Sequence, residues 1–304
     1  MTNAILVREQ VVSATRRRRT PVNAEQLLPV WLRNTVITIL LAAVLLPTVY
    51  ILLASLMPDV DVARGQLIPR TLDLSNYVRI WSTVNLGLGL VNSLIVCLAV
   101  AVVCSVLSVI TAYCLVRYTF VGRITVLRGL MSAQSIPGTM LLLPVFVLYS
   151  SASSLLNIQI VGSLGGLFIT YLTFALPFST WIMVTYLRGF PIEFEEAARL
   201  DGCSTVGVLR RVIMPLSWPA IVVSGIFAFL LGWNDVLFAS VLTRPETQTT
   251  AVVLQVFGAA QDGGSFPLYG QVMASAVVCA APVVLLYMIF QRYLVSGMTA
   301  GGIK

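Results

Sequence analysis

The feature that most constrains this chain is a series of six apolar runs, each long enough to cross a bilayer as a helix. They lie at about residues 34–57, 88–115, 126–150, 160–186, 216–242 and 268–294. Roughly twenty apolar residues in a helix span the hydrocarbon core of a membrane. Apolar residues make up 58% of the chain and charged residues only 10%, unlike a soluble domain. We therefore expect an all-α membrane protein with six transmembrane helices.

Several of these runs contain prolines. Neighbouring helices and waters in a bundle can satisfy the carbonyl groups that a proline leaves without a partner. We therefore expect kinked but continuous helices at Pro47, Pro137, Pro144, Pro177 and Pro282.

The distribution of basic residues predicts the orientation of the chain. With the amino terminus in the cytoplasm, most of the 19 basic residues lie on the cytoplasmic side, and only Arg64, Arg70, Arg79 and Arg244 lie outside. Cytoplasmic loops carry such an excess. We expect residues 1–30, which include an arginine run, to form a disordered cytoplasmic arm, and residues 297–304 to form a cytoplasmic tail. The helices occupy residues 31–296.

Composition excludes several chemistries. The chain has no histidine, and its single lysine, Lys304, is the last residue, so neither a histidine metal site nor the lysine of a P-loop is possible. The net charge of +7 is explained by orientation and does not indicate nucleic acid. The cysteines have no C-x-x-C spacing and are interpreted as small apolar residues rather than metal ligands: Cys97, Cys104, Cys114, Cys203 and Cys279.

The loop at residues 188–215 has signals for two short helices. Pro191 suits a first helical position, acidic residues follow in the first turns, and the helix should end near Asp201. Gly202 then suits a left-handed carboxyl cap, and Ser204 or Thr205 can cap a second helix. On these residues alone, a surface helix at the headgroups and a lever for a soluble partner are equally good interpretations.

Five residues of this loop resemble the EAA motif of ABC importer permeases: Glu196, Ala197, Ala198, Gly202 and Pro215. The motif's isoleucine and leucine are replaced here by Val212 and Met214. The run at residues 233–235 and the ending GMTAGGIK are similar to the carbohydrate branch, with maltose-type permeases the nearest. The resemblance covers about residues 30–304 and implies a type I ABC importer permease with six helices and cytoplasmic coupling helices.

The resemblance also implies partners and a location. Such importers join two homologous permease subunits, two cytoplasmic ATPases that bind ATP and Mg, and an extracytoplasmic sugar-binding protein or lipoprotein. This chain would be a non-enzymatic transport subunit, without a cofactor or metal of its own, in the lipid of a bacterial inner membrane. The implied ATPase-coupling residues are Glu196, Ala197, Ala198, Asp201, Gly202 and Pro215, and the implied tail contacts are Thr299, Gly301 and Gly302.

A polar group within the fifth run is a candidate for the translocation pathway. Asp235 is an acidic residue inside a predicted span, which is a functional hypothesis in itself, and Trp233 and Asn234 precede it. The group could bind a sugar, or Asp235 could bond a neighbouring helix and hold the bundle together. Asn92 and Ser93 are interpreted as groups that bond helices. Residues 243–267 are expected to form a long polar external loop, which by resemblance enters the cleft of the binding protein.

Other functions fit the sequence less well. A permease of the same type for a non-sugar solute, such as a glycerophosphate compound, stays open because the sequence does not identify the solute. Ion-coupled transporters usually carry several ionisable residues within the membrane or matched broken helices in two repeats. A membrane enzyme would need a convergent set of reactive groups, which the sequence does not provide.

Overall fold

The computed structural model describes residues 29–261 and 267–299, with side chains to residue 293. The expected arm, apart from its last two residues, lies outside this part of the chain, as do Gly301 and Gly302. Thr299 is the last residue of the final helix. The chain has two compact units, residues 1–50 and 51–304. The described part of the first unit is most of the helix that begins at Val30.

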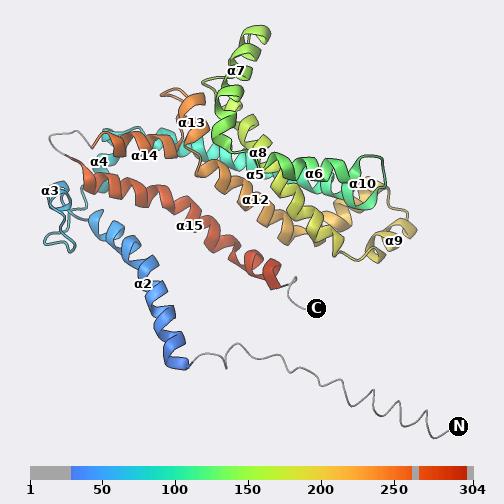
Figure 1. Cartoon of the computed structure of the whole chain (residues 1–304), viewed down its shortest axis with the longest axis horizontal. Coiled ribbons are helices and arrows are strands. Elements are labelled where there is room, and N and C mark those ends of the chain that lie inside the picture. Colours follow the sequence, from blue (N-terminus) through green and yellow to red (C-terminus); the bar gives the residue numbers. More distant parts are fainter. Residues whose placement is uncertain (1–28, 262–266, 300–304) are drawn as a thin grey trace, which may run out of the picture. The chain divides into compact units, whose positions relative to one another are not determined.

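The described residues form helices joined by short segments (Figure 1). In chain order the elements are α2 Val30–Ala54, α3 Asp59–Ala63, α4 Asn76–Thr83, α5 Leu86–Arg117, α6 Arg123–Ala133, α7 Gly138–Leu156, α8 Leu164–Arg188, α9 Glu193–Leu200, α10 Thr205–Val208, the π-helix η2 Leu209–Ile213, α11 Met214–Leu216, α12 Trp218–Trp233, α13 Leu237–Leu242, α14 Thr250–Ala259 and α15 Tyr269–Thr299.

Five of the described helices, α2, α5, α7, α8 and α15, are long and apolar enough to cross a membrane. A sixth span is supplied if the bent pair Thr205–Leu216 and Trp218–Trp233 is counted as one. The all-helical fold with up to six spans is therefore confirmed. The prolines Pro47, Pro144, Pro177 and Pro282 lie inside continuous helices, as expected.

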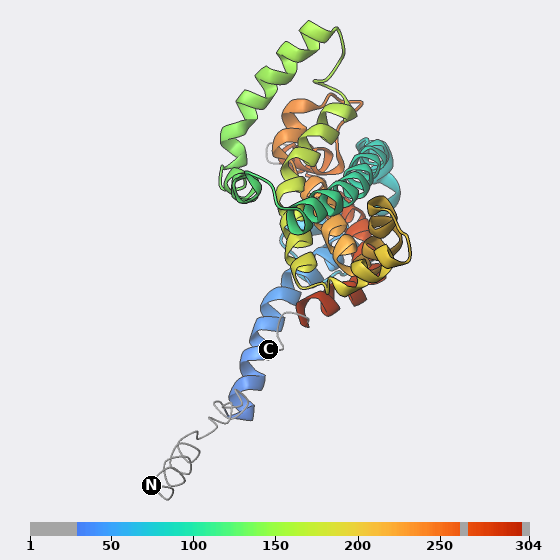
Figure 2. The ribbon, with the colours of Figure 1, turned by 90° about the vertical axis from the view of Figure 1, so that its right-hand side faces the viewer.

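The prediction of a single third helix at residues 126–150 is wrong. The chain forms α6, leaves the helical conformation before Pro137, and starts α7 at Gly138. In Figure 2 α6 is seen along its axis and α7 from the side, so the chain turns sharply between them. Proline lacks an N–H group and disfavours a helical residue before it. Here both effects end the helix.

The prediction of a continuous fifth helix at residues 216–242 is also wrong. At the start of this run the helix axis bends by 78° between Leu216 and Trp218, next to the proline in the first turn of α12, where proline favours a bend. A second break, inside the run, separates α12 from α13 and contradicts the prediction. This second break falls at Asn234 and Asp235, residue types whose side chains compete with the helical backbone for hydrogen bonds.

The external segment expected as a polar loop at residues 243–267 contains the apolar helix α14. This helix packs on both α5 and α15. Because it has only ten residues, it is too short to give a strong periodic signal beside the polar residues that flank it.

The core lies where α5, α8 and α12 pack against one another (Figure 1). Leu167 and Tyr171 of α8 are fully or almost fully buried there, as is Phe229 of α12. The hydroxyl groups of Ser108 on α5 and Ser224 on α12 lie 3.2 Å apart and share a hydrogen bond. Small and hydroxyl-bearing residues commonly join helices inside membranes. A second apolar cluster fastens α9 and α10 to one end of this bundle.

Candidate functional site

The segment from α9 to α10 is a helix, a tight turn and a second helix. Gly202 adopts φ +82°, the left-handed conformation that its position predicts. The N–H of Cys203 donates to the carbonyl of Ala198 at 3.0 Å, and the Ser204 hydroxyl accepts from the N–H of Gly207 at 3.2 Å. Ser204 is therefore the cap of α10. Pro191 does not start the first helix as expected, because α9 begins two residues later.

The inner face of α9 is fixed to α5 by a buried ion pair. Glu195 is 2% exposed, and its carboxylate lies 2.6 Å from Nε of Arg117. The hydroxyl of Tyr113 donates to the same carboxylate at 3.3 Å, and Arg117 also donates to the carbonyl of Phe190 at 3.1 Å. Interaction with the Tyr113 hydroxyl raises the pKa of Arg199, one turn further along α9. The loop is thus anchored to the last turn of α5.

The outer face of α9 and the turn is open to its surroundings. Five of the six predicted coupling residues are exposed, namely Glu196, Ala197, Asp201, Gly202 and Pro215, whereas Ala198 is buried against the bundle. Within the described part of the chain, the Glu196 carboxylate has no hydrogen-bond or ion-pair partner. Leu200 is 89% exposed beside it. The outer face therefore carries an unpaired carboxylate beside an exposed leucine.

The anchor formed by Arg117, Tyr113 and Glu195 is absent from the sequence-based set of site residues. The helical period could have identified Glu195 as a residue on the inner face of α9. Residues one position apart on a helix point about 100° apart, whereas residues three apart share a face. Glu195 and Ala198 therefore face the core together, and Glu196 faces away. The partner Arg117 could not be identified in this way, since it lies on a different helix.

Trp233, Asn234 and Asp235 lie at the carboxyl-terminal end of α12, and each has different surroundings. Trp233 is buried, and its ring stacks on Phe229 with a centroid distance of 5.2 Å. Asn234 is exposed and donates to the carbonyl of Leu230 at 2.9 Å. One face of the tryptophan ring is therefore covered.

The carboxylate of Asp235 is used within the chain. It accepts a hydrogen bond from the hydroxyl of Tyr171 on α8 at 2.9 Å. It also accepts from the N–H groups of Phe238 at 3.3 Å and Ala239 at 2.9 Å, which are in the first turn of α13. These contacts are those of a group that joins helices.

A groove of about 530 Å³ lies beside this group, between α12, α14 and α15. Its polar lining comes from Asn234, Thr250 and Gln255, and its other residues include Trp233 and Val283. The hydroxyl of Thr250 is buried without a hydrogen-bond partner among the described residues. Thr250 and Gln255 are absent from the sequence-based set, because they lie in the segment that was expected to be an external loop.

The amino-terminal end of α5 contacts the segment of α14 through three residues on one helix face. The amide nitrogen of Asn92 donates to the carbonyls of Glu246 at 3.1 Å and Gln248 at 3.0 Å. The Ser93 hydroxyl accepts from the N–H of Thr250 at 2.8 Å. A Cβ atom at Gly89 would approach Val253 to 3.0 Å, so only glycine allows this packing without a shift. Asn92 and Ser93 therefore bond segments of the chain, in agreement with their interpretation.

Comparison with known proteins identifies relatives of this chain. Residues 104–300 match the family described as "Binding-protein-dependent transport system inner membrane component". The trehalose transport system permease protein SugB of Mycobacterium tuberculosis is 32% identical over 88% of this chain and 95% of its own length. The sulfoquinovosyl glycerol transport system permease protein SmoH of Agrobacterium fabrum is 33% identical over 90% and 93% of the two chains.

A third relative and a solved structure extend the comparison. The trehalose/maltose transport system permease protein MalG of Thermococcus litoralis is 31% identical over 86% of this chain and 91% of its own length. A chain in the crystal structure of a bacterial ABC transporter that imports alginate superposes with a TM-score of 0.75 at 23% identity, over 86% and 95% of the two chains. That structure shows the same fold.

Proposed function

Because this chain belongs to the family of binding-protein-dependent transport system inner membrane components, we propose that it is a membrane subunit of an ATP-driven sugar importer and forms half of its translocation pathway. The relatives above are named for trehalose, for sulfoquinovosyl glycerol and for trehalose with maltose. All three are sugars or sugar derivatives, which supports the class of solute. Because they differ, the identity of the solute needs its own experiment.

The chain works with partners that supply the chemistry. ATP and Mg bind to two cytoplasmic ATPase subunits, a division of labour with which the missing P-loop lysine of this chain agrees. A second, homologous permease completes the pathway, and an extracytoplasmic binding protein delivers the sugar. The chain lies in the cytoplasmic membrane of a bacterium, with both termini and α9 on the cytoplasmic side. The excess of basic residues at that side supports this orientation.

The single observation that carries the proposal is the division of α9 into two faces. Its inner face is fixed by the ion pair of Glu195 with Arg117, and its outer face leaves Glu196 and Leu200 exposed. A helix held in this way moves together with the end of α5. Docking of an ATPase on the outer face would therefore transmit closure of the ATPase pair to the membrane helices.

The remaining assignments follow from this arrangement. Asp201, Gly202 and Pro215 belong to the proposed docking surface, Ala197 lies beside it, and Ala198 holds the helix to the bundle. Thr299, Gly301 and Gly302 are proposed to reach the ATPases. The groove with Asn234, Thr250 and Gln255 is proposed to line the pathway, with Trp233 at its edge. Asp235 supports the groove rather than binding sugar, because its oxygens already accept three hydrogen bonds.

Uptake into proteoliposomes tests the proposal. The full importer, reconstituted with ATP inside and binding protein outside, is offered labelled trehalose, maltose, sulfoquinovosyl glycerol and glycerol 3-phosphate in turn. ATP-dependent accumulation of a sugar, abolished when the binding protein is omitted, is the expected result. Accumulation of glycerol 3-phosphate alone, or uptake driven by an ion gradient without ATP, would contradict it.

A further inference from the structure

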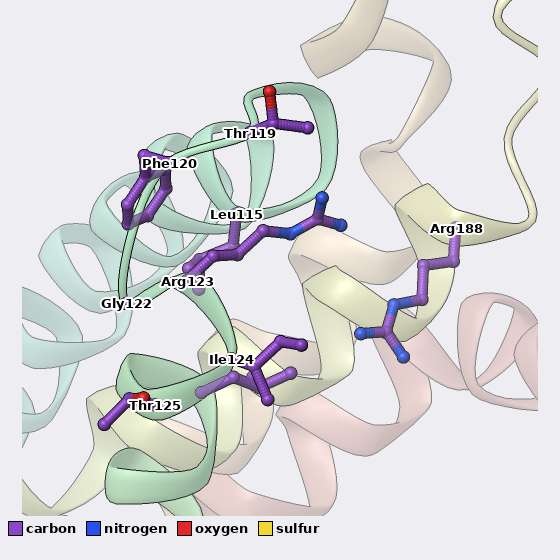
Figure 3. A pocket seen from close by; sticks show the side chains of 9 residues that line it. Leu115, Thr119, Phe120, Gly122, Arg123, Ile124, Thr125 and Arg188 are labelled. Atoms are coloured by element: carbon purple, nitrogen blue, oxygen red, sulfur yellow. The ribbon is translucent and has the colours of Figure 1, made fainter.

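A basic pocket lies between the turn that joins α5 to α6 and the last residue of α8 (Figure 3). Its volume is about 520 Å³, and it is separate from the groove and from the outer face of α9. Its lining combines two arginines, two threonines and an apolar floor, and no carboxylate. The lining residues are Leu115, Thr119, Phe120, Gly122, Arg123, Ile124, Thr125, Leu127 and Arg188.

The two arginines give the pocket an uncompensated positive charge. Arg123 extends from the start of α6 and Arg188 from the end of α8, on opposite sides of the space between them (Figure 3). Neither guanidinium has a hydrogen-bond or ion-pair partner among the residues that the structure describes. Arg117, six residues before Arg123, differs because it is paired with Glu195. A guanidinium carries five N–H donors in a planar fork that fits the oxygens of a phosphate.

The position of the pocket places it at the depth of lipid headgroups. Arg188 ends the apolar span of α8, and the span of α5 ends at Arg117, just before the turn. The side chains around the arginines are apolar and open. Ile124 is 62% exposed, and Val121, at the tip of the turn, is fully exposed. Apolar side chains beside arginines are typical of a surface that meets both acyl chains and headgroups.

We propose that this pocket binds the phosphate group of an anionic phospholipid. The two guanidinium groups hold the phosphate oxygens, and the apolar residues of the turn and of α6 contact the acyl chains. Basic pockets between transmembrane helices on the cytoplasmic side bind such headgroups in other membrane proteins. A bound lipid would fill the space between α6 and α8 and so support the start of α6 on the bundle. This site goes beyond the proposed transport function and does not depend on the identity of the sugar.

The test measures lipid binding directly in the assembled importer. The complex is placed in nanodiscs of phosphatidylcholine with increasing phosphatidylglycerol, extracted, and its bound lipid is counted by native mass spectrometry. The wild-type complex should retain phosphatidylglycerol. The double variant Arg123→Gln/Arg188→Gln should bind it about thirtyfold more weakly, since each basic residue near the surface contributes roughly fivefold. Arg188→Lys, which keeps the charge, should lose less.

A matched control removes the same charge elsewhere. Arg33 and Arg128 are exposed and lie outside the pocket, and neither side chain has a hydrogen-bond or ion-pair partner among the described residues. The double variant Arg33→Gln/Arg128→Gln should therefore retain the lipid. Equal loss of lipid in both double variants would show a general charge effect and overturn the proposal.

Two further measurements distinguish a bound lipid from a free anion and from a protein in the pocket. Inorganic phosphate at millimolar concentration should leave the bound lipid in place, and displacement of the lipid by it would indicate a site for a free anion. If the arginine variant retains lipid but loses its ATPase subunits, the pocket binds an acidic protein surface, and the lipid assignment is wrong.

Discussion

Polar side chains make different contacts at the two ends of the bundle formed by α5, α8 and α12. At the α9 end, Glu195 is buried in an ion pair while its neighbour Glu196 is exposed without a partner in the described part of the chain. At the opposite end, Asn92, Ser93 and Asp235 all bond other segments of the same chain. The first end therefore leaves a carboxylate open at the surface where we propose that an ATPase docks, and the second uses its polar groups to hold broken helices together.

Removing Glu195 should have the largest effect on stability. Glu195→Ala leaves the Arg117 guanidinium, with a side chain only 12% exposed, without its counter-charge. Breaking a buried pair in this way costs about 3 to 5 kcal/mol. Thermal unfolding of the purified importer complex measures the loss. Glu193→Ala, which removes an exposed carboxylate from the same helix, should change the unfolding temperature little. Equal effects of both variants would remove the distinction between the two faces of α9.

The second effect concerns Asp235. Asp235→Ala removes two hydrogen bonds to the first turn of α13 and leaves the Tyr171 hydroxyl without its acceptor, at a cost of about 1 to 3 kcal/mol. Asp235→Asn keeps an acceptor oxygen and should preserve most of the stability and of the sugar uptake. Uptake that is lost in Asp235→Asn while the unfolding temperature is unchanged would place the carboxylate in the pathway instead.

The third effect is confined to the turn after α9. Gly202→Val should cost about 1 to 3 kcal/mol, because a side chain is strained at φ +82°. Nothing lies within 4 Å of a Cβ atom at this position, so the cost comes from the backbone alone. Gly202→Asn should be milder, since asparagine tolerates the left-handed region. Coupled uptake is the measurement, and equal loss with both variants would show that the side chain, not the turn, matters.

The smallest effect tests the far end of the bundle. Asn92→Ala removes two hydrogen bonds to the backbone before α14, worth about 1 to 2 kcal/mol together. Hydrogen exchange of residues 246–250 in the complex should speed up. Ser82→Ala removes an exposed hydroxyl that bonds only within its own helix and is the control. Unchanged exchange in Asn92→Ala would mean that α14 is held by its apolar contacts alone.

Much of the fold could be predicted because membrane spans have a strong signal. The limits of α5, α8 and α15 agree with the predicted runs to within a few residues at most ends. The break at Pro137 could not be predicted from apolarity, since prolines also lie inside continuous spans elsewhere. The break at Asp235 could not be predicted in this way either, because two polar residues do not interrupt an otherwise apolar run. Pro144, only seven residues after Pro137, lies within α7. Which proline ends a helix depends on packing.

The candidate site could be predicted in part. The turn at Gly202 follows from local backbone rules and needs no tertiary contact. The pairing of Glu195 with Arg117 joins residues that are far apart in the sequence, so no local pattern predicts it. Thr250 and Gln255 became candidates only because α14 folds back onto α5 and α15, which local sequence signals do not specify.

The most direct test of the central claim measures ATP hydrolysis by the reconstituted importer, with and without sugar-loaded binding protein. If the outer face of α9 couples the membrane helices to the ATPases, Glu196→Ala should reduce the stimulated rate by about tenfold or more, because a contact at a protein interface is lost. Glu193→Ala should hydrolyse ATP like the wild type. Equal and slight effects of the two variants would contradict the assignment of α9 as the coupling element.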